Sequence, residues 1–296
     1  DGQAKKRWQV FENDLKNNHI PYHSVTTEYQ NHATELATEA VSSGHNRIGV
    51  FSGDGTLNEV LQGMFKENKI ISDDLKLIFF PAGSSCDFEK KFKNNRSFIK
   101  RFQADDSIAI DIFKVECRDF SGKRISRYII NNSSIGIISL ANEKFNSVTG
   151  LTKKIKQMSV DAGAVISGLR AITQFKPFQA EMVIDGINIP EQYLSNTTVF
   201  KTGHFGGDMS YGVEPVQDDG QLSVVWLDGT SKLGLAALMP SLFTGTVLNK
   251  KLAHYKTCHK FELRTEDNVF VETDGENIGI PPVKYTIHQK ALQIII

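Results

Sequence analysis

The hydrophobic pattern of this chain changes near Ala109, and the change limits the folds that are open to it. Before that residue, strand-like runs alternate with helical patterns, as in RIGVFS (47–52), a helical stretch at about 56–67 and KLIFF (76–80). Such alternation indicates a parallel sheet with helices on its faces. After it, short strand-like segments separated by Gly and Asp turns dominate, which is typical of a β-sandwich or barrel. We therefore predict an α/β domain followed by a mainly β domain.

Further elements follow from the same spacing patterns. In the first half we expect a short strand near Tyr22–Thr26 and helices at about 4–18, 32–43 and 86–93. The helical pattern starts so close to residue 1 that we expect a strand to precede it in the complete fold. In the second half we expect a hairpin around RDFSGK, one helix within 150–175, and short strands at 179–186, 197–202, 221–228, 256–265, 269–276 and 283–288.

The bulk composition argues against several classes of protein. The 296 residues carry 34 Lys and Arg and 34 Asp and Glu, and this formal charge of zero argues against a global attraction to nucleic acid. No apolar run approaches the roughly 20 residues of a membrane span, and no signal peptide is visible. The widely spaced Cys86, Cys117 and Cys258 are typical of reduced thiols in the cytosol. We therefore expect a soluble, cytoplasmic protein and leave contact with a membrane surface open.

One predicted junction between a strand and a helix has the features of a phosphate-binding turn, in the segment VFSGDGTLNEVLQG (50–63). Gly53 and Gly55 provide a backbone that a ligand can approach closely. Thr56 and Glu59 match a capping box, which predicts that the helix begins at Thr56 with its free N–H groups facing the turn. An Asp-Gly hairpin is the alternative, but the helical pattern that follows disfavours it. A dinucleotide fingerprint fits poorly, because asparagine stands at its third glycine.

A negative charge within such a turn needs an explanation, because Asp54 alone would repel a bound triphosphate. Phosphoryl transfer uses Mg²⁺ to separate such charges, so we predict that Asp54 holds Mg²⁺ on the nucleotide or lies close to the reacting hydroxyl. The segment FFPAGSSCDF (79–88) offers a second such turn, with Gly83 and Ser84 after a strand. Asp87 lies near a helix start there, where a simple N-cap is the alternative. Both turns are expected to face one crevice.

Five segments, in order and spacing, resemble the signatures of the diacylglycerol kinase catalytic domain family, which includes bacterial diacylglycerol kinases and sphingosine and ceramide kinases. The family's G-G-D-G-T-x-N-E signature is similar to SGDGTLNEVLQG, and its P-x-G-T-x-N-D-F-A segment to PAGSSCDFEKKF. Its upstream T-x-x-x-x-x-A segment resembles TTEYQNHATELATEA. The glycine-rich and D-G-E segments of its second domain resemble FGGDMSYGVEPVQDDGQLSVVWL and VETDGENIG. The resemblance extends over nearly the whole chain.

The resemblance implies an ATP site and its residues. The phosphate loop would be formed by Ser52, Gly53, Asp54, Gly55, Thr56, Leu57 and Asn58, together with Gly83 and Asp87 of the second turn. Thr27 (or Thr26, if the register shifts by one) and Ser84 would add hydroxyl contacts to the nucleotide. Asp54 would also be one of the catalytic residues.

The resemblance implies a catalytic base and a metal site in the second half. Glu276, in a D-G-E turn, would be the general base on the acceptor hydroxyl, a role for which a positioned carboxylate is suited. Asp219 would hold a structural Mg²⁺ together with the backbone carbonyls of Val216 and Gln221. Without the family, a solvated hairpin turn remains the alternative for the D-G-E segment, and a simple β-turn the alternative at Asp219.

The resemblance also implies the fold. A Rossmann-like parallel sheet of the NAD kinase and diacylglycerol kinase type is expected at residues 1–108 plus 288–296, with the last strand returning to the first domain. A β-rich sandwich that binds the substrate is expected at 109–287. Catalysis would take place in the cleft between the two domains.

Several residues depart from the family pattern. Ser52 replaces the first glycine of G-G-D-G, which a negative φ tolerates, and Ser84 replaces threonine but keeps a hydroxyl. Cys86 replaces the asparagine of N-D-F and loses its amide hydrogen bonds, which puts any nucleotide or loop contact of that position in doubt. Asp208 lies in a stretch that usually holds small residues, where it can alter the choice of substrate.

We therefore predict an ATP- and Mg²⁺-dependent lipid kinase that phosphorylates a hydroxyl of diacylglycerol or a related lipid. Its partners are expected to be a lipid with a free hydroxyl and, transiently, the inner face of a membrane, but no nucleic acid. Lys153, Lys154 and Lys156 offer either a basic contact with anionic lipid or a solvated helix face. A homodimer is left open.

Three other functions remain as alternatives. A kinase of a soluble hydroxyl acceptor, similar to NAD kinases, shares the G-D-G turn and the two-domain plan. A non-catalytic nucleotide or lipid binder would have Ser52 and Cys86 as its signs. A pyridine-nucleotide oxidoreductase is disfavoured, because the dinucleotide fingerprint fails.

Overall fold

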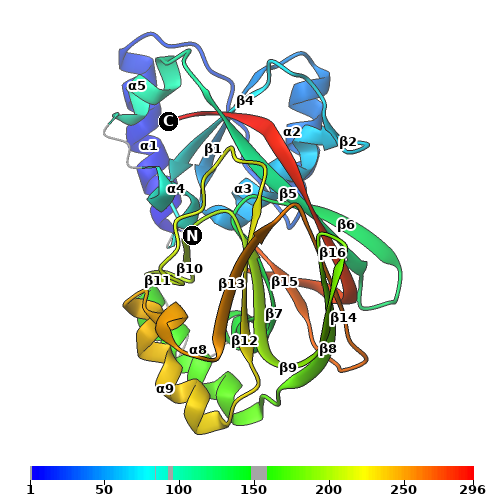
Figure 1. Ribbon diagram of the computed structural model, residues 1–296. Coiled ribbons are helices and arrows are strands. Elements are labelled where there is room, and N and C mark those ends of the chain that lie inside the picture. The colour runs from blue at the N-terminus through cyan, green and yellow to red at the C-terminus, as the bar shows by residue number, and fades with distance from the viewer. Residues whose placement is uncertain (1, 84, 93–95, 148–158) are drawn as a thin grey trace. The chain divides into compact units, whose positions relative to one another are not determined.

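The computed structural model describes residues 2–83, 85–92, 96–147 and 159–296 (Figure 1). The chain forms two compact units, Asp1–Asp111 with Lys290–Ile296 and Ile112–Gln289. It passes from the first unit into the second along β5 (Ile108–Arg118) and returns along β16 (Glu276–Ile295). Each unit has its own apolar core, so each has the anatomy of a domain.

The first unit is built on a parallel sheet. β1 (Arg47–Ser52) pairs in parallel with β4 (Lys76–Pro81), and β4 pairs in parallel with Gln293–Ile295 of β16. Parallel neighbours need a crossover, and α3 supplies it between β1 and β4. The helices and the small hairpin of this unit are α1 (Gly2–Asn17), α2 (His32–Ser42), α3 (Asp54–Met64), α4 (Asp87–Lys91), α5 (Phe98–Gln103), β2 (Phe65–Lys66) and β3 (Lys69–Ile70).

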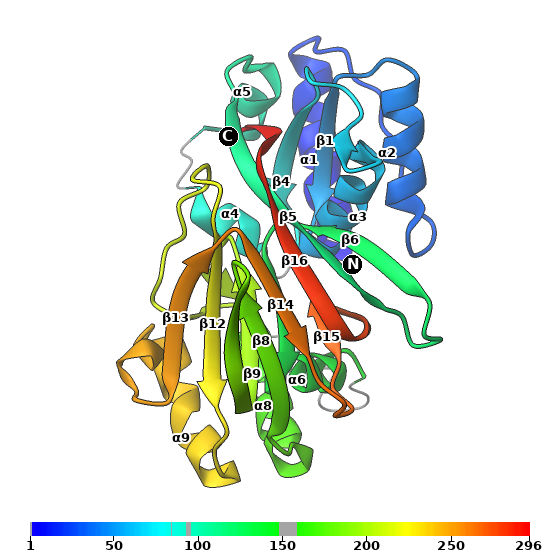
Figure 2. The ribbon, with the colours of Figure 1, turned by 45° about the vertical axis from the view of Figure 1, so that its right-hand side comes forward.

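The second unit is mainly antiparallel β-structure (Figure 2). Its strands besides β5 and β16 are β6 (Arg124–Ile129), β7 (Asn132–Gly136), β8 (Phe178–Ile184), β9 (Ile187–Phe200), β10 (His204–Phe205), β11 (Met209–Ser210), β12 (Leu222–Asp228), β13 (Ala253–Cys258), β14 (Lys260–Arg264) and β15 (Val271–Thr273). Its helices are α6 (Ile137–Asn146), α8 (Val160–Gln174), α9 (Lys232–Phe243) and the 3₁₀ turn η1 (Val247–Asn249).

Two long strands change neighbours along their length and so close the second unit around its core. β9 pairs first with β8 and then with β7, while β16 pairs first with β15 and then with β14. Because β7 also pairs with β15 and β8 with β14, the pairings form a closed circuit. Its inward-facing side chains, such as Ile135, Met182, Phe261, Val271 and Tyr285, belong to one buried cluster.

The fold class predicted from the sequence is confirmed. The helices expected at about 4–18 and 32–43 and the strands expected at 47–52 and 76–80 are all present. Among the described helices, none has the length and apolar character that a membrane span requires.

Several boundaries were wrong, for identifiable reasons. Tyr22–Thr26 is not a strand; the Tyr22 hydroxyl instead donates a hydrogen bond to Glu12, and most of the segment is exposed. The single strand expected at 256–265 is two strands, β13 and β14, because the Asp185 carboxylate accepts the N–H groups of His259 and Lys260 at the corner. Helices α5, α6 and α9 were not predicted at all.

Candidate functional site

The turns after β1 and β4 meet backbone against backbone. Ser52 pairs with Pro81 at the end of the parallel register, and the Ala82 N–H donates to the Ser52 carbonyl at 2.9 Å. A Cβ added to Gly83 would lie 2.5 Å from the Cα of Gly53, a distance that atoms do not reach without a shift of the backbone. The contact between the two turns therefore requires a glycine at position 83, while a Cβ on Gly53 would make a close contact of 3.3 Å with Gly83 Cα.

Helix α3 begins two residues earlier than predicted, at Asp54. Gly53 is its N-cap, with an extended backbone, and the capping box expected from Thr56 and Glu59 is not formed. Thr56 Oγ1 instead accepts a hydrogen bond from Ser52 Oγ at 2.9 Å. Glu59 faces away from this end of the helix, because its Oε2 accepts the N–H of Ala33 in α2 at 3.3 Å. The capping-box motif is present in the sequence, but the box does not form because the Glu59 carboxylate binds the backbone of α2 instead.

The early start leaves the first N–H groups of α3 at the turn after β1. The first N–H groups of an α-helix have no intrahelical acceptor, and here they belong to the residues around Gly55 and Thr56. Gly55 is exposed, and a Cβ on it would meet nothing within 4 Å. Open N–H groups at the positive end of the helix dipole are suited to phosphate oxygens.

The Asp54 carboxylate is directed at the second turn. Its Oδ2 accepts the N–H of Asp87 at 2.8 Å and its Oδ1 accepts the N–H of Phe88 at 3.2 Å, so it caps helix α4. These charge-assisted hydrogen bonds explain how a turn of this kind can carry a carboxylate without an obligatory cation. A role of Asp54 toward Mg²⁺ or the reacting hydroxyl stays a prediction.

The N-cap of α4 is Cys86, and the expected cap, Asp87, is the first residue of the helix. Cys86 has a left-handed backbone (φ 51°), a conformation that asparagine adopts more readily than most residues. Burial, followed by the charge of Asp54, raises the pKa of the Cys86 thiol to about 11, so it stays protonated at neutral pH. The Asp87 carboxylate pairs with Lys90 at 3.0 Å.

The other residues predicted for the nucleotide divide into three groups. Leu57 and Asn58 are buried within α3, where the Asn58 side chain accepts a hydrogen bond from Gln62 at 3.3 Å. These two buried side chains pack inside the first unit and hold the start of α3 in place. Thr27 lies exposed between α1 and α2, and among the described residues no hydrogen bond joins it to the turns. Ser84, like Lys153, Lys154 and Lys156, lies outside the described residues.

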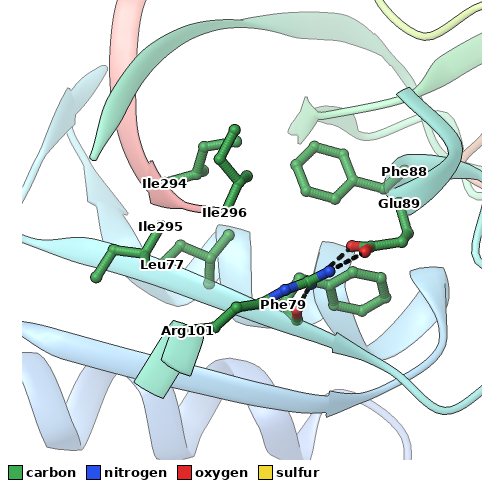
Figure 3. Close-up of a pocket in the computed structure, with 8 residues that line it drawn as sticks. All are labelled: Leu77, Phe79, Phe88, Glu89, Arg101, Ile294, Ile295 and Ile296. Atoms are coloured by element: carbon green, nitrogen blue, oxygen red, sulfur yellow. Dashed lines mark hydrogen bonds and ion pairs between the residues drawn. The ribbon is translucent and has the colours of Figure 1, made fainter. Parts of the chain in front are cut away.

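A buried ion pair fixes α4 against β4. Arg101 of α5 is 3% exposed, and both of its terminal nitrogens donate hydrogen bonds to the Glu89 carboxylate (Figure 3). One of them, Nη1, also donates to the Phe79 carbonyl at 3.0 Å. The pair lines a small apolar pocket together with Leu77, Phe79, Phe88, Ile294, Ile295 and Ile296. None of the predicted site residues lines this pocket. Its ion pair holds the short helix whose first N–H groups Asp54 caps.

In the second unit, the predicted general base follows a tight hairpin turn. Asp274 (φ 43°) and Gly275 (φ 95°) both have left-handed backbones, and Thr273 pairs with Glu276 across them. Positive φ at both central residues is the property of a type I′ turn. The simpler interpretation of the D-G-E segment is thus right about its backbone.

Polar groups from two other elements hold this turn. The Asp274 carboxylate, 8% exposed, accepts the N–H groups of residues 130–132 at 3.0–3.3 Å. The Gly275 carbonyl accepts the side-chain amides of Asn142 and Asn146 in α6, at 2.5 and 3.0 Å. The sequence analysis did not identify these supports, because they come from segments distant in the chain.

Glu272, two residues before the turn, is a buried acid that was also missed. It is 3% exposed, and its Oε1 accepts the Gly275 N–H at 2.6 Å. Burial, together with the nearby Asp274, raises the pKa of Glu272 to about 8. The side chain is therefore largely protonated at neutral pH, while Asp274 takes the role of charged acceptor.

Glu276 faces a cation rather than open solvent alone. Its Oε2 lies 3.1 Å from Nη2 of Arg127 in β6, and the carboxylate side chain is 34% exposed. Among the described residues, this ion pair is the single polar contact of the Glu276 carboxylate. Arg127 thus orients a partly accessible carboxylate on a rigid strand, and no local sequence signal pointed to it.

The oxygens predicted for a structural Mg²⁺ are held by a lysine. Lys201 Nζ donates to the carbonyls of Val216 (2.6 Å) and Gln221 (2.9 Å) and to Oδ1 of Asp219 (3.0 Å). Mg²⁺ would require these oxygens at about 2.0–2.1 Å, and a second cation would be repelled by the ammonium. The residues present do not fit a metal here, and no cluster of three His, Cys, Asp or Glu suited to a metal occurs in the described part of the chain.

Family models match both units of the chain. The diacylglycerol kinase catalytic domain matches residues 1–115, and the YegS C-terminal NAD kinase beta sandwich-like domain matches residues 134–296. The second match covers more than half of the chain, so the chain belongs to the family with the YegS C-terminal NAD kinase beta sandwich-like domain, and its first 115 residues match the diacylglycerol kinase catalytic domain. The glycine turns thus lie in the catalytic-domain match, and the D-G-E turn lies in the sandwich match.

Individual relatives are similar over most of their length. A diacylglycerol kinase of Mycobacterium tuberculosis is 23% identical over 274 residues, which is 89% of this chain and 81% of the relative. A diacylglycerol kinase of Bacillus subtilis is 19% identical over 264 residues, 89% of this chain and 82% of the relative. A solved diacylglycerol kinase structure from Bacillus anthracis has a TM-score of 0.67 at 21% identity and covers 91% of this chain and 83% of its own. That likeness confirms the fold.

Proposed function

We propose that the protein is a lipid kinase of the diacylglycerol kinase type, which transfers the γ-phosphoryl group of ATP to a lipid hydroxyl. The observation that carries the proposal is the pair of glycine turns touching at Gly53 and Gly83, beside the open first turn of α3. The match of the first 115 residues to the diacylglycerol kinase catalytic domain and the names of the relatives support the same reaction class.

The first unit supplies the nucleotide contacts in this proposal. The N–H groups around Gly55 and Thr56 bind phosphate oxygens, and the Thr56 hydroxyl, which accepts a hydrogen bond from Ser52, adds one donor beside them. Asp54 keeps the two turns together through Asp87 and Phe88. When bound with ATP, Mg²⁺ supplies charge neutralisation of the triphosphate.

The second unit supplies the proton acceptor. Glu276 takes the proton of the acceptor hydroxyl while the new O–P bond forms and the bond from the γ-phosphorus to the ADP oxygen breaks. Arg127 restricts the orientation of the carboxylate at 3.1 Å, and its partial exposure leaves it open to a substrate hydroxyl. The turn beneath it is rigid, because Asp274 and Glu272 accept its surrounding N–H groups.

The test is transfer of label from γ-labelled ATP, in the presence of Mg²⁺, to a panel of lipids in mixed micelles. The panel contains diacylglycerol, a sphingoid base, ceramide and phosphatidylglycerol, and the label is followed into the organic phase. We expect one lipid class to be labelled. Glu276→Gln should lower kcat by roughly 10²- to 10⁴-fold, the range for loss of a general base.

Glu262→Gln is the matched control, because Glu262 is also a strand carboxylate in ion pairs, with Lys260 and Arg264, but lies outside the proposed site. Its kcat should stay close to that of the wild type. Transfer of the label to an added soluble acceptor such as NAD, with none to lipid, would favour a kinase of a soluble acceptor instead. Binding of Mg·ATP without any transfer would favour a non-catalytic binder.

A further inference from the structure

The ammonium group of Lys201 lies at the centre of three oxygen atoms, where a metal ion would lie in a metal site. Lys201 follows directly after β9, and its side chain is fully buried, with 0% exposure. Its Nζ lies 2.6–3.0 Å from three oxygens, two backbone carbonyls (Val216 and Gln221) and the Asp219 carboxylate. These are the three oxygens for which the family resemblance implies Mg²⁺.

The geometry matches an ammonium group. An –NH₃⁺ group has three donors and no acceptor, so three oxygens satisfy it completely. The observed distances are those of N–H···O hydrogen bonds and are well above the 2.0–2.1 Å of Mg²⁺–oxygen bonds. One ammonium and one carboxylate also balance in charge, whereas Mg²⁺ with Asp219 alone would leave a net positive charge.

The loop is wrapped around the lysine from several sides. The Gln217 side-chain amide donates to the Lys201 carbonyl, so the loop also binds the backbone of the lysine. The Gln221 N–H donates to Asp219 Oδ1 at 2.9 Å, which holds the carboxylate toward the ammonium. Gly220 has a left-handed backbone (φ 72°) that lets the chain turn back between these two residues.

We propose that Lys201 is a built-in cation that takes the place of a structural divalent metal in the second unit. It ties residues 216–221 to the end of β9 through three hydrogen bonds of its ammonium group, one of which is also the ion pair with Asp219. The fold of this unit then needs no divalent metal ion, and any need for Mg²⁺ arises with the nucleotide alone. This inference concerns folding and holds whether or not the protein proves to be a kinase.

The experiment measures thermal unfolding of the full chain without nucleotide, in excess EDTA and in millimolar MgCl₂ or CaCl₂. We expect the Tm of the wild type to be the same in EDTA and in metal, within about 1 °C. Lys201→Ala should lower the Tm by roughly 5–10 °C in EDTA, because it leaves Asp219 and two carbonyls without their cation. Added Mg²⁺ or Ca²⁺ should raise the Tm of this variant, because it can enter the emptied oxygen site.

Two controls make the result specific. Lys256→Ala, which removes an exposed lysine of β13, should change the Tm little in either buffer. The double variant Lys201→Ala with Asp219→Asn should lose the metal response. A wild-type Tm that falls in EDTA and returns with Mg²⁺ would overturn the proposal, and so would a Lys201→Ala variant as stable as the wild type. The wild-type comparison decides the matter even where the variant does not fold.

Discussion

The glycine turns of the first unit and the D-G-E turn of the second both place polar groups at strand ends, but different forces hold them. Gly53 and Gly83 meet through their backbones, and the contact depends on the absence of side chains. The turn at Asp274 and Gly275 is held instead by carboxyl groups that accept surrounding N–H groups. The first arrangement depends on close packing of the backbones and leaves N–H groups open, whereas the second pairs its surrounding backbone N–H groups with carboxyl groups.

Under the function proposed above, this difference follows from what each turn would present to its ligand. A phosphate site needs unpaired N–H donors, so its turn cannot be stabilised by filling every donor. A general base needs one carboxylate in a fixed position, so the backbone around Glu276 can be fully bonded. The two turns should therefore respond to different substitutions.

The largest effect is expected from Gly83→Ala. The new Cβ would meet Gly53 Cα at 2.5 Å, and neither backbone can yield without separating the turns. We expect a loss of about 3 kcal/mol in unfolding free energy and a fall of at least roughly tenfold in Mg·ATP affinity. Urea unfolding and calorimetric titration measure the two quantities.

A ranking of glycine variants sharpens this test. A Cβ on Gly53 would lie 3.3 Å from Gly83 Cα, and one on Gly55 would meet nothing within 4 Å. Stability should therefore fall most for Gly83→Ala, less for Gly53→Ala and not at all for Gly55→Ala. Equal losses at the three positions would contradict the steric explanation.

A smaller loss is expected from Asp274→Ala in the second unit. Three N–H groups of residues 130–132 lose their charged acceptor, so we expect the free energy of unfolding to fall by about 2 kcal/mol. We also expect kcat to be lower. Asp274→Asn should be milder, because asparagine keeps an oxygen and tolerates the left-handed backbone. Asp267→Ala is the control, since its exposed carboxylate accepts one such N–H, that of Gln179. Equal unfolding free energies for the two alanine variants would count against the anchoring role.

A pH effect is expected from Glu272. Its pKa rises from 4.5 to about 8 on folding, so the folded state binds this proton more tightly than the unfolded state. Its contribution to stability is complete below pH about 4.5 and is lost as the pH rises through about 8. The Tm of the wild type should therefore fall more steeply than that of Glu272→Gln between about pH 6 and about 9. Parallel Tm curves for the two proteins would show that Glu272 does not titrate there.

The smallest effect is expected from Cys86→Asn. Cys86 has a left-handed backbone that costs free energy in most residues and less in asparagine. We expect the free energy of unfolding to rise by about 0.5 kcal/mol, which would be measured as a slightly higher Tm. A lower Tm would mean that the buried thiol packs better there than the amide and outweighs the backbone preference.

The local parts of both turns were predictable from the sequence. SGDG after a strand and before a helix predicted an open helix N-terminus, and Gly53 and Gly83 lie together as the parallel pattern required. The capping box was predicted wrongly, because Glu59 binds Ala33 of another helix. Spacing along the chain describes neighbours within one turn of a helix, but it contains no information about competition from a packed partner.

Patterns along the chain predicted most strands and helices of the first unit, the change from α/β to mainly β structure and the glycine turns, because periodicity and backbone freedom are local properties. The tertiary structure alone decided which charged groups meet. Asp54 caps α4 and Arg127 orients Glu276. Lys201 donates hydrogen bonds to the oxygens that were expected to bind a metal ion. Each of these contacts joins groups at least 15 residues apart, and burial selects them by removing water as the competing partner.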